Sequence, residues 1–202
     1  DESGAWRTRF IPELIAEARD LGAEVIQVNH PRDSTGYFDT VGLTLGASIE
    51  ELEHPHWTPD FNTIEIYNGS SDFCVVMRDW QGLLSQGLRI VGVGNSDSHD
   101  LSRPVGYPRN YLPTRATSPT EITREEVVDA LTQGRVSVGG GAYIDLPDGP
   151  LLGDRISGAR QTLRVRVRTA PFSQVTRIIA LHHGVEIWSQ EITGGEQDIV
   201  DF

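Results

Sequence analysis

The sequence predicts an α/β protein whose parallel sheet is followed by a small all-β module. Apolar residues recur at helical spacing from Phe10 to Leu21, and Gly22 is placed to end that helix. Short runs rich in β-branched residues occur at 23–28, 63–67 and 88–93, and they alternate with the helical stretches. This alternation of helix and strand is typical of a parallel sheet, so we expect the three runs to pair in parallel.

The remaining elements of the first part follow the same order. Pro12 suits the first turn of the first helix, and a long loop over 31–61 contains a short helix near 48–52. A helix is expected over 73–85, ended by Gly87, and a last helix begins at Thr120 or Thr123 and ends at Gly134.

The pattern changes to a period of two near Arg135. Leu163, Val165 and Val167 alternate with arginines, which indicates a strand with one solvated face. Further strands are expected at 176–182, 185–192 and 197–202. We therefore divide the chain into an α/β part, 1–138, and an incomplete β-sandwich-like module, 139–202.

The charge of the chain excludes some classes of partner. The 202 residues carry 17 basic and 29 acidic side chains, a net charge of −12, and every basic residue is Arg. Such a chain lacks the basic surface that a nucleic-acid backbone requires. No apolar run reaches the roughly 18 residues of a membrane span. A single cysteine excludes an internal disulfide.

The first residue is Asp1 and the only methionine is Met77. With an apolar pair close to the last residue, this suggests that the sequence is a piece of a longer polypeptide. We expect a soluble protein of the bacterial cytoplasm or periplasm; its oligomeric state is left open.

Residues able to bind a metal follow each predicted strand. His30 follows the first strand, Asn68 the second, and Asp97 and His99 the third. The carboxyl ends of parallel strands share one edge, where ligands gather. A carboxylate and imidazoles that converge there suit Zn²⁺, Mn²⁺ or Fe²⁺. The alternatives are that His30 bonds a loop and that Asp97 belongs to a polar turn.

Three other side chains are candidates for the same edge. Glu65 lies within a buried strand, where it either orients a metal-binding histidine or faces a neighbouring polar residue. Arg32 and Arg109 lie in loops over that edge, where each either binds an anionic group or pairs with an acid. The loop histidines His54 and His56 are expected to be solvated.

Four sequence blocks resemble the polymerase-and-histidinol-phosphatase (PHP) superfamily, and within it the carbaryl-hydrolase-type branch. The blocks are Asn29-His30-Pro31, Glu65-Ile66-Tyr67-Asn68-Gly69, Gly94-Asn95-Ser96-Asp97-Ser98-His99 and Pro108-Arg109-Asn110-Tyr111. The resemblance covers about residues 8–140, and the trailing β module is also typical of that branch.

The resemblance implies a distorted (β/α)7 barrel, of which this chain supplies part, with two or three divalent metal ions at the strand ends. His30, Asp97 and His99 would be metal ligands, and Asn68 and Arg109 would contact the substrate. Glu65 would support a ligand. The family's N-terminal His-x-His motif and its second-motif Glu and His are absent, so the first half of the barrel is expected to precede Asp1 or to lie on another chain.

The implied activity of the parent protein is that of a metal-dependent hydrolase, in which metal-bound hydroxide attacks a small phosphoester, carboxyl ester or carbamate, and this chain alone is expected to be inactive. The alternative is a non-catalytic binding or structural module with an incomplete metal site.

Overall fold

The computed structural model describes residues 9–69, 73–158, 162–170, 172–173, 175–192 and 197–201. Its helices are α1 (Ile11–Asp20), α2 (Tyr37–Thr40), η1 (Ile49–Glu51), α3 (Phe73–Ser85), η2 (Pro119–Glu121) and α4 (Arg124–Gln133). Its strands are β1 (Gln27–Val28), β2 (Thr63–Asn68), β3 (Val91–Asn95), β4 (Arg109–Tyr111), β5 (Ser137–Gly139), β6 (Ala142–Asp145), β7 (Arg164–Thr169), β8 (Arg177–His182), β9 (Val185–Glu191) and β10 (Gln197–Asp201).

The parallel pairing of the first three strands is confirmed. They form one sheet in the order β1-β2-β3, with Val28 opposite Ile64 and Ile64 opposite Gly92. β1 is only two residues long, although a strand was expected over 23–28. The carboxyl ends of all three strands lie at one edge of the sheet, which fixes the position of the candidate site.

The main core lies against this sheet. Ile64 and Ile66 of β2 pack with Val76 and Leu83 of α3 and with Phe38 of α2. Helix α3 has the predicted bounds. Helix α4 begins at Thr123 rather than Thr120, because the Thr123 hydroxyl accepts a hydrogen bond from the Glu126 backbone N–H. It ends at Gly134, whose φ of 74° is left-handed.

The predicted fold class, part of a (β/α)7 barrel followed by a sandwich, is wrong. The described residues contain one parallel sheet of three strands and three small antiparallel sheets, and they form no closed barrel. Beyond β3 the chain forms the antiparallel pair β4-β5. The side chain of Asn110 in β4 donates to the Gly94 carbonyl oxygen and accepts from the Gly94 N–H, both at 2.8 Å. A side chain thus fills the position on β3 where a further parallel strand would pair.

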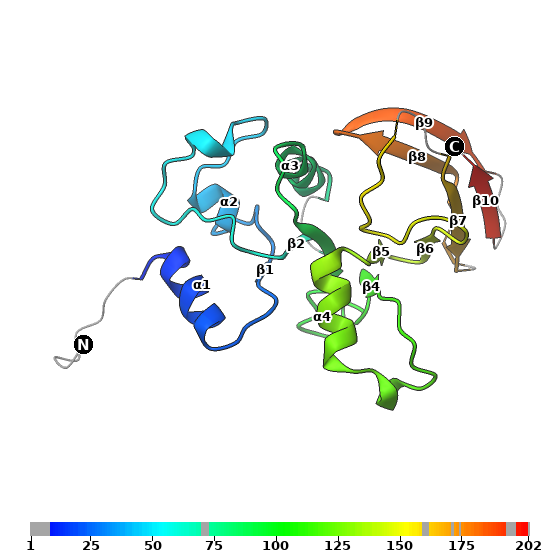
Figure 1. Ribbon diagram of the computed structural model, residues 1–202, viewed down its shortest axis with the longest axis horizontal. Coiled ribbons are helices and arrows are strands. Elements are labelled where there is room, and N and C mark those ends of the chain that lie inside the picture. The colour runs from blue at the N-terminus through cyan, green and yellow to red at the C-terminus, as the bar shows by residue number, and fades with distance from the viewer. Residues whose placement is uncertain are drawn as a thin grey trace.

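The C-terminal strands lie together on the side of the molecule away from α1 (Figure 1). One sheet has the order β10-β7-β6, and the other is the hairpin β8-β9. Val165 and Val167 of β7 and Ile178 of β8 form a second, smaller core. Strand β5 spans the predicted boundary between residues 138 and 139, and that division of the chain stays a prediction.

Candidate active site at the strand ends

Glu65 is the centre of the polar cluster at the carboxyl ends of the strands. The residue is 3% exposed, and its carboxylate accepts three hydrogen bonds. The donors are the backbone N–H of His30 at 2.5 Å, the Asn95 amide at 2.8 Å and the Asn68 amide at 3.0 Å. These three donors come from the ends of β1, β3 and β2, so one carboxylate ties together all three strand ends.

The surroundings of Glu65 leave its charge uncompensated. Among the described residues, no Arg or His nitrogen lies within 4.0 Å of its carboxylate. A buried carboxylate is costly unless it is paired or fully hydrogen-bonded. Here only neutral donors satisfy it, so the cluster presents a negative potential at the edge of the sheet.

A bulge in β2 contributes to this arrangement. The register between β2 and β3 shifts between Glu65 and Tyr67, after which Asn68 lies opposite Asn95. An irregularity of this kind turns side chains away from strict alternation. It allows Glu65 and Asn68, three positions apart, to meet on one side of the strand end.

Two residues at this edge have left-handed backbones. His30 has φ 28° and Asp97 has φ 48°, and neither is a glycine. Such conformations cost of order 1–3 kcal/mol and cluster at functional sites. The hydrogen bond from the His30 N–H to Glu65 supports the first of them. The strain therefore occurs at two residues that the sequence selects as metal ligands.

Asp97 and His99 interact with each other and with Arg103. His99 Nδ1 lies 2.8 Å from the Asp97 carbonyl oxygen and 3.4 Å from Asp97 Oδ1. Arg103 Nη1 lies 3.5 Å from Asp97 Oδ2. The His99 side chain is 74% exposed. The imidazole and the carboxylate are thus close neighbours at the surface.

The predicted metal ligands do not form a complete site in the described part of the chain. His30 Nδ1 faces Asp33 Oδ2 at 3.8 Å, whereas Asp97 and His99 pair at the end of β3. No group of three or more His, Cys, Asp or Glu side chains able to hold a metal ion is present among the described residues. The described side chains therefore bring Asp97 and His99 together but do not bring His30 to them.

The side chains of Arg109 and Asn68 differ in exposure and in the number of hydrogen bonds that they make. The Arg109 side chain is exposed on β4 and makes no hydrogen bond or ion pair within the described residues. Asn68 is 3% exposed and donates to Glu65, so its amide is fixed. Arg109 can therefore bind an anion, whereas the Asn68 amide is used within the protein to hold the Glu65 carboxylate at the strand ends.

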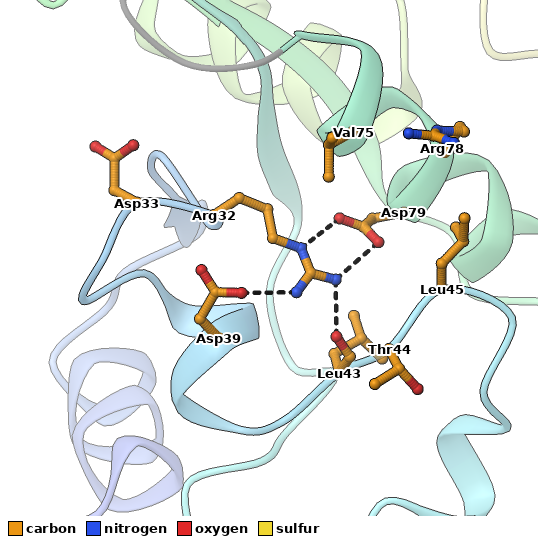
Figure 2. A pocket seen from close by; sticks show the side chains of 9 residues that line it. All are labelled: Arg32, Asp33, Asp39, Leu43, Thr44, Leu45, Val75, Arg78 and Asp79. Carbon is orange, nitrogen blue, oxygen red and sulfur yellow. Dashed lines mark hydrogen bonds and ion pairs between the residues drawn. The ribbon is translucent and has the colours of Figure 1, made fainter.

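Arg32 takes the other of its two predicted roles, that of an ion pair. Its Nε and Nη2 donate to the Asp79 carboxylate at 2.7 and 2.8 Å, its Nη1 to Asp39 and its Nη2 to the Leu43 carbonyl oxygen (Figure 2). The hydrogen bond to Asp79 raises the pKa of Arg32 above its usual value, and burial opposes that rise. Although Arg32 lines a cavity of about 500 Å³, its donors are almost all used by the protein.

His54 and His56 have structural contacts. His54 Nδ1 accepts the His56 backbone N–H at 3.2 Å, and His56 Nδ1 accepts the Ile11 N–H at 3.3 Å. A ring whose Nδ1 accepts a hydrogen bond carries its proton on Nε2 and has no free lone pair for a metal. These contacts join the loop to the start of α1 and remove both rings from the list of candidate ligands.

Sequence reasoning missed three polar groups at the edge. Asn95 binds Glu65 and Asn110 binds Gly94, both through side-chain amides. Tyr67 bonds the side chain of Tyr107, and burial together with that neighbour raises the pKa of Tyr67. The position of Asn95 at the end of its strand, which matches that of Asn68, could have identified it as a residue of this edge.

Comparisons with protein-family models, with curated proteins and with solved structures found no match to this chain. Within the described residues, no helix is long and apolar enough to cross a membrane.

Proposed function

We propose that the strand-end cluster is part of the reaction centre of a metal-dependent hydrolase that acts on small phosphoesters, carboxyl esters or carbamates. The observation that carries the proposal is the position of Glu65, whose uncompensated carboxylate joins the three strand ends and binds the His30 backbone N–H. The motif resemblance to the PHP superfamily supports the same reaction class.

The chain's own residues have separate tasks in this proposal. Asp97 and His99, which contact each other at the end of β3, would bind the ion together. Arg109 binds the anionic oxygen of the substrate through its unused N–H groups. Glu65 is a positioning residue that acts through the His30 backbone.

The metal enters the proposal as a binding prediction. His30, Asp97 and His99 are the ligands that we propose for Zn²⁺, Mn²⁺ or Fe²⁺. Because they do not form a three-ligand group, we assign no catalytic step to the ion. The net charge of the cluster favours a cation, since Glu65 has no cationic partner among the described residues.

The test is hydrolysis of bis(p-nitrophenyl) phosphate and of p-nitrophenyl acetate by the protein that carries this chain with the rest of the centre, purified with each metal, with metal content measured by elemental analysis. Changing Asp97→Asn is expected to lower metal content and to lower kcat by at least about 100-fold, because even residues that only orient a metal ligand contribute about 10–100-fold. The matched control is Asp100→Asn, an exposed carboxylate in the same loop that bonds Ser102. Absence of stoichiometric metal, or an equal effect of both variants, overturns the proposal.

A second candidate is a non-catalytic binding module. The observation that favours it is the pairing of Asp97 with both Arg103 and His99, which occupies the carboxylate in the absence of any ligand. Stoichiometric metal binding without turnover of either substrate would support this module and exclude the hydrolase.

A further inference from the structure

An apolar cavity of about 420 Å³ is lined by residues of β2, β3 and α3 and of the segment that follows α4. Ile66 of β2 and Gly92 of β3 line one side of it, and Trp80 of α3 lines another. Gln133, Gly134, Val136 and Val138, at and after the end of α4, and Leu152 also line it. Ile66 lines this cavity, whereas the Glu65 carboxylate lies in the polar cluster at the strand ends.

The walls of the cavity are preformed. The Trp80 Nε1–H donates to the Ile90 carbonyl oxygen at 2.8 Å, which satisfies the only polar atom of the indole. A Cβ atom at Gly92 would lie 2.7 Å from Ile66 Cδ1 and 3.2 Å from the Trp80 ring. The Ile66 side chain and the Trp80 ring therefore pack directly against the bare backbone of Gly92, which fixes the position of these two walls of the cavity.

One charged group stands at this apolar site. Among the described residues that line the cavity, Arg89 is the only charged one. It donates one hydrogen bond, from Nη2 to the Gly153 carbonyl oxygen at 3.2 Å, and within the described residues it makes no ion pair. The remaining guanidinium N–H groups have no protein partner among those residues. Although the chain carries a net charge of −12, Arg89 has no acidic partner among the described residues, so its guanidinium can bind an anionic group at the cavity.

We infer that this cavity binds a small apolar carboxylic acid, with its hydrocarbon part against Trp80 and Gly92 and its carboxylate on Arg89. The volume lies in the range of small-molecule sites, which are mostly apolar with a few placed polar groups. A guanidinium binds a carboxylate through charge-assisted hydrogen bonds. The inference does not depend on the hydrolase proposal, because it uses none of the strand-end residues.

The experiment uses benzoate and hexanoate as probes, with benzyl alcohol and hexanol as neutral partners of similar shape. Binding is measured by calorimetry and by ¹⁵N chemical shifts of the Gly92, Gly134 and Gly153 amides in the unaltered chain. Each carboxylate is expected to bind at least about tenfold more tightly than its alcohol, since a hydrogen bond to a charged group contributes at least that factor. The shifts of these glycines are expected to move with both.

Two variants test the role of the charge. Arg89→Gln is expected to weaken the carboxylates about tenfold and to leave the alcohols unchanged. Arg78→Gln is the matched control, because Arg78 is an exposed arginine on α3 that lines a different cavity, of about 500 Å³. It is expected to change neither affinity.

Leu152→Trp, which fills the cavity, is expected to abolish binding of all four probes. Equal affinities for acid and alcohol, or shifts that leave the three glycine amides unmoved, overturn the inference without any variant. A dimer that Leu152→Trp dissociates, detected by light scattering, would show that a second copy of the chain covers this face, and would overturn it too.

Discussion

Among the described residues of the α/β part, Glu65 and Asp79 are the two buried carboxylates, and their partners differ in charge. Asp79 is 4% exposed and receives two hydrogen bonds from the Arg32 guanidinium. Glu65 is 3% exposed and receives three hydrogen bonds from neutral amides. The two groups are buried equally, but only Asp79 has its charge balanced within the described protein.

This difference indicates a structural role for the Arg32–Asp79 pair and a functional role for the cluster around Glu65. A carboxylate paired with a guanidinium in a bidentate geometry is satisfied, and it has no further need of a ligand. A carboxylate held only by neutral donors keeps its field, and that field acts on whatever occupies the strand-end edge. The Asp79 pair thus stabilises the loop after β1, whereas the Glu65 cluster is suited to a cation or a developing positive charge.

The largest effect is expected from breaking the balanced pair. Arg32→Ala leaves Asp79 buried without its cation and should lower the free energy of unfolding by about 3–5 kcal/mol. Urea unfolding followed by circular dichroism measures this. Arg78→Ala on the same region of α3 removes an exposed arginine and should change the free energy of unfolding by less than about 0.5 kcal/mol. A loss below about 1 kcal/mol for Arg32→Ala would show that the pair adds little, and the contrast with Glu65 would fail.

A smaller effect is expected from neutralising Glu65. Glu65→Gln keeps the size of the side chain, but its amide group faces donors from His30, Asn68 and Asn95. One unsatisfied contact of this kind costs about 1–3 kcal/mol, less than the loss of the buried ion pair. The same variant should also lower metal affinity, measured by competition with a chelating dye. Unchanged metal affinity would show that the field of Glu65 does not act at the edge.

The sequence predicts the helices and the strand-end positions around Glu65 and Asp79 better than it predicts which side chains contact each other. Period and stop signals place α3 and α4 correctly, because those signals are local and their apolar stripes are strong. Position after a strand correctly selects His30 and Asn68 as residues of one edge, because parallel strands share their carboxyl ends.

The partners of each side chain were not predictable, because they depend on contacts far apart in the chain. Arg32 and Asp79 are 47 positions apart, and no local pattern links them. Asn110 closes the edge of β3 from 16 positions away, and so the expected continuation toward a barrel was wrong. The predicted metal site requires the rings of His30 and His99 to converge. Their positions after two neighbouring strands do not determine the directions of the side chains.

The smallest effect concerns alkaline pH in the region of Arg32. Burial raises the pKa of Tyr37 to about 12 from an ordinary value of 10.0. The Tyr37 hydroxyl donates to the Thr58 carbonyl oxygen at 2.8 Å and accepts the Thr58 N–H at 2.7 Å. The folded chain holds this proton more tightly than the unfolded chain does, so its contribution to stability is complete below pH 10 and is lost as the pH rises toward 12.

The urea midpoint should therefore fall between pH 10 and pH 12, and Tyr37→Phe should reduce that fall, since phenylalanine has no proton to lose. The variant starts from a lower midpoint at neutral pH because it loses the bonds to Thr58, so the slope with pH is the quantity to compare. Equal slopes in both proteins would place the alkaline sensitivity elsewhere. Because Tyr37 is adjacent to Phe38, over whose ring the Arg32 guanidinium lies, a difference in slope would show that this side of the molecule loosens first at high pH.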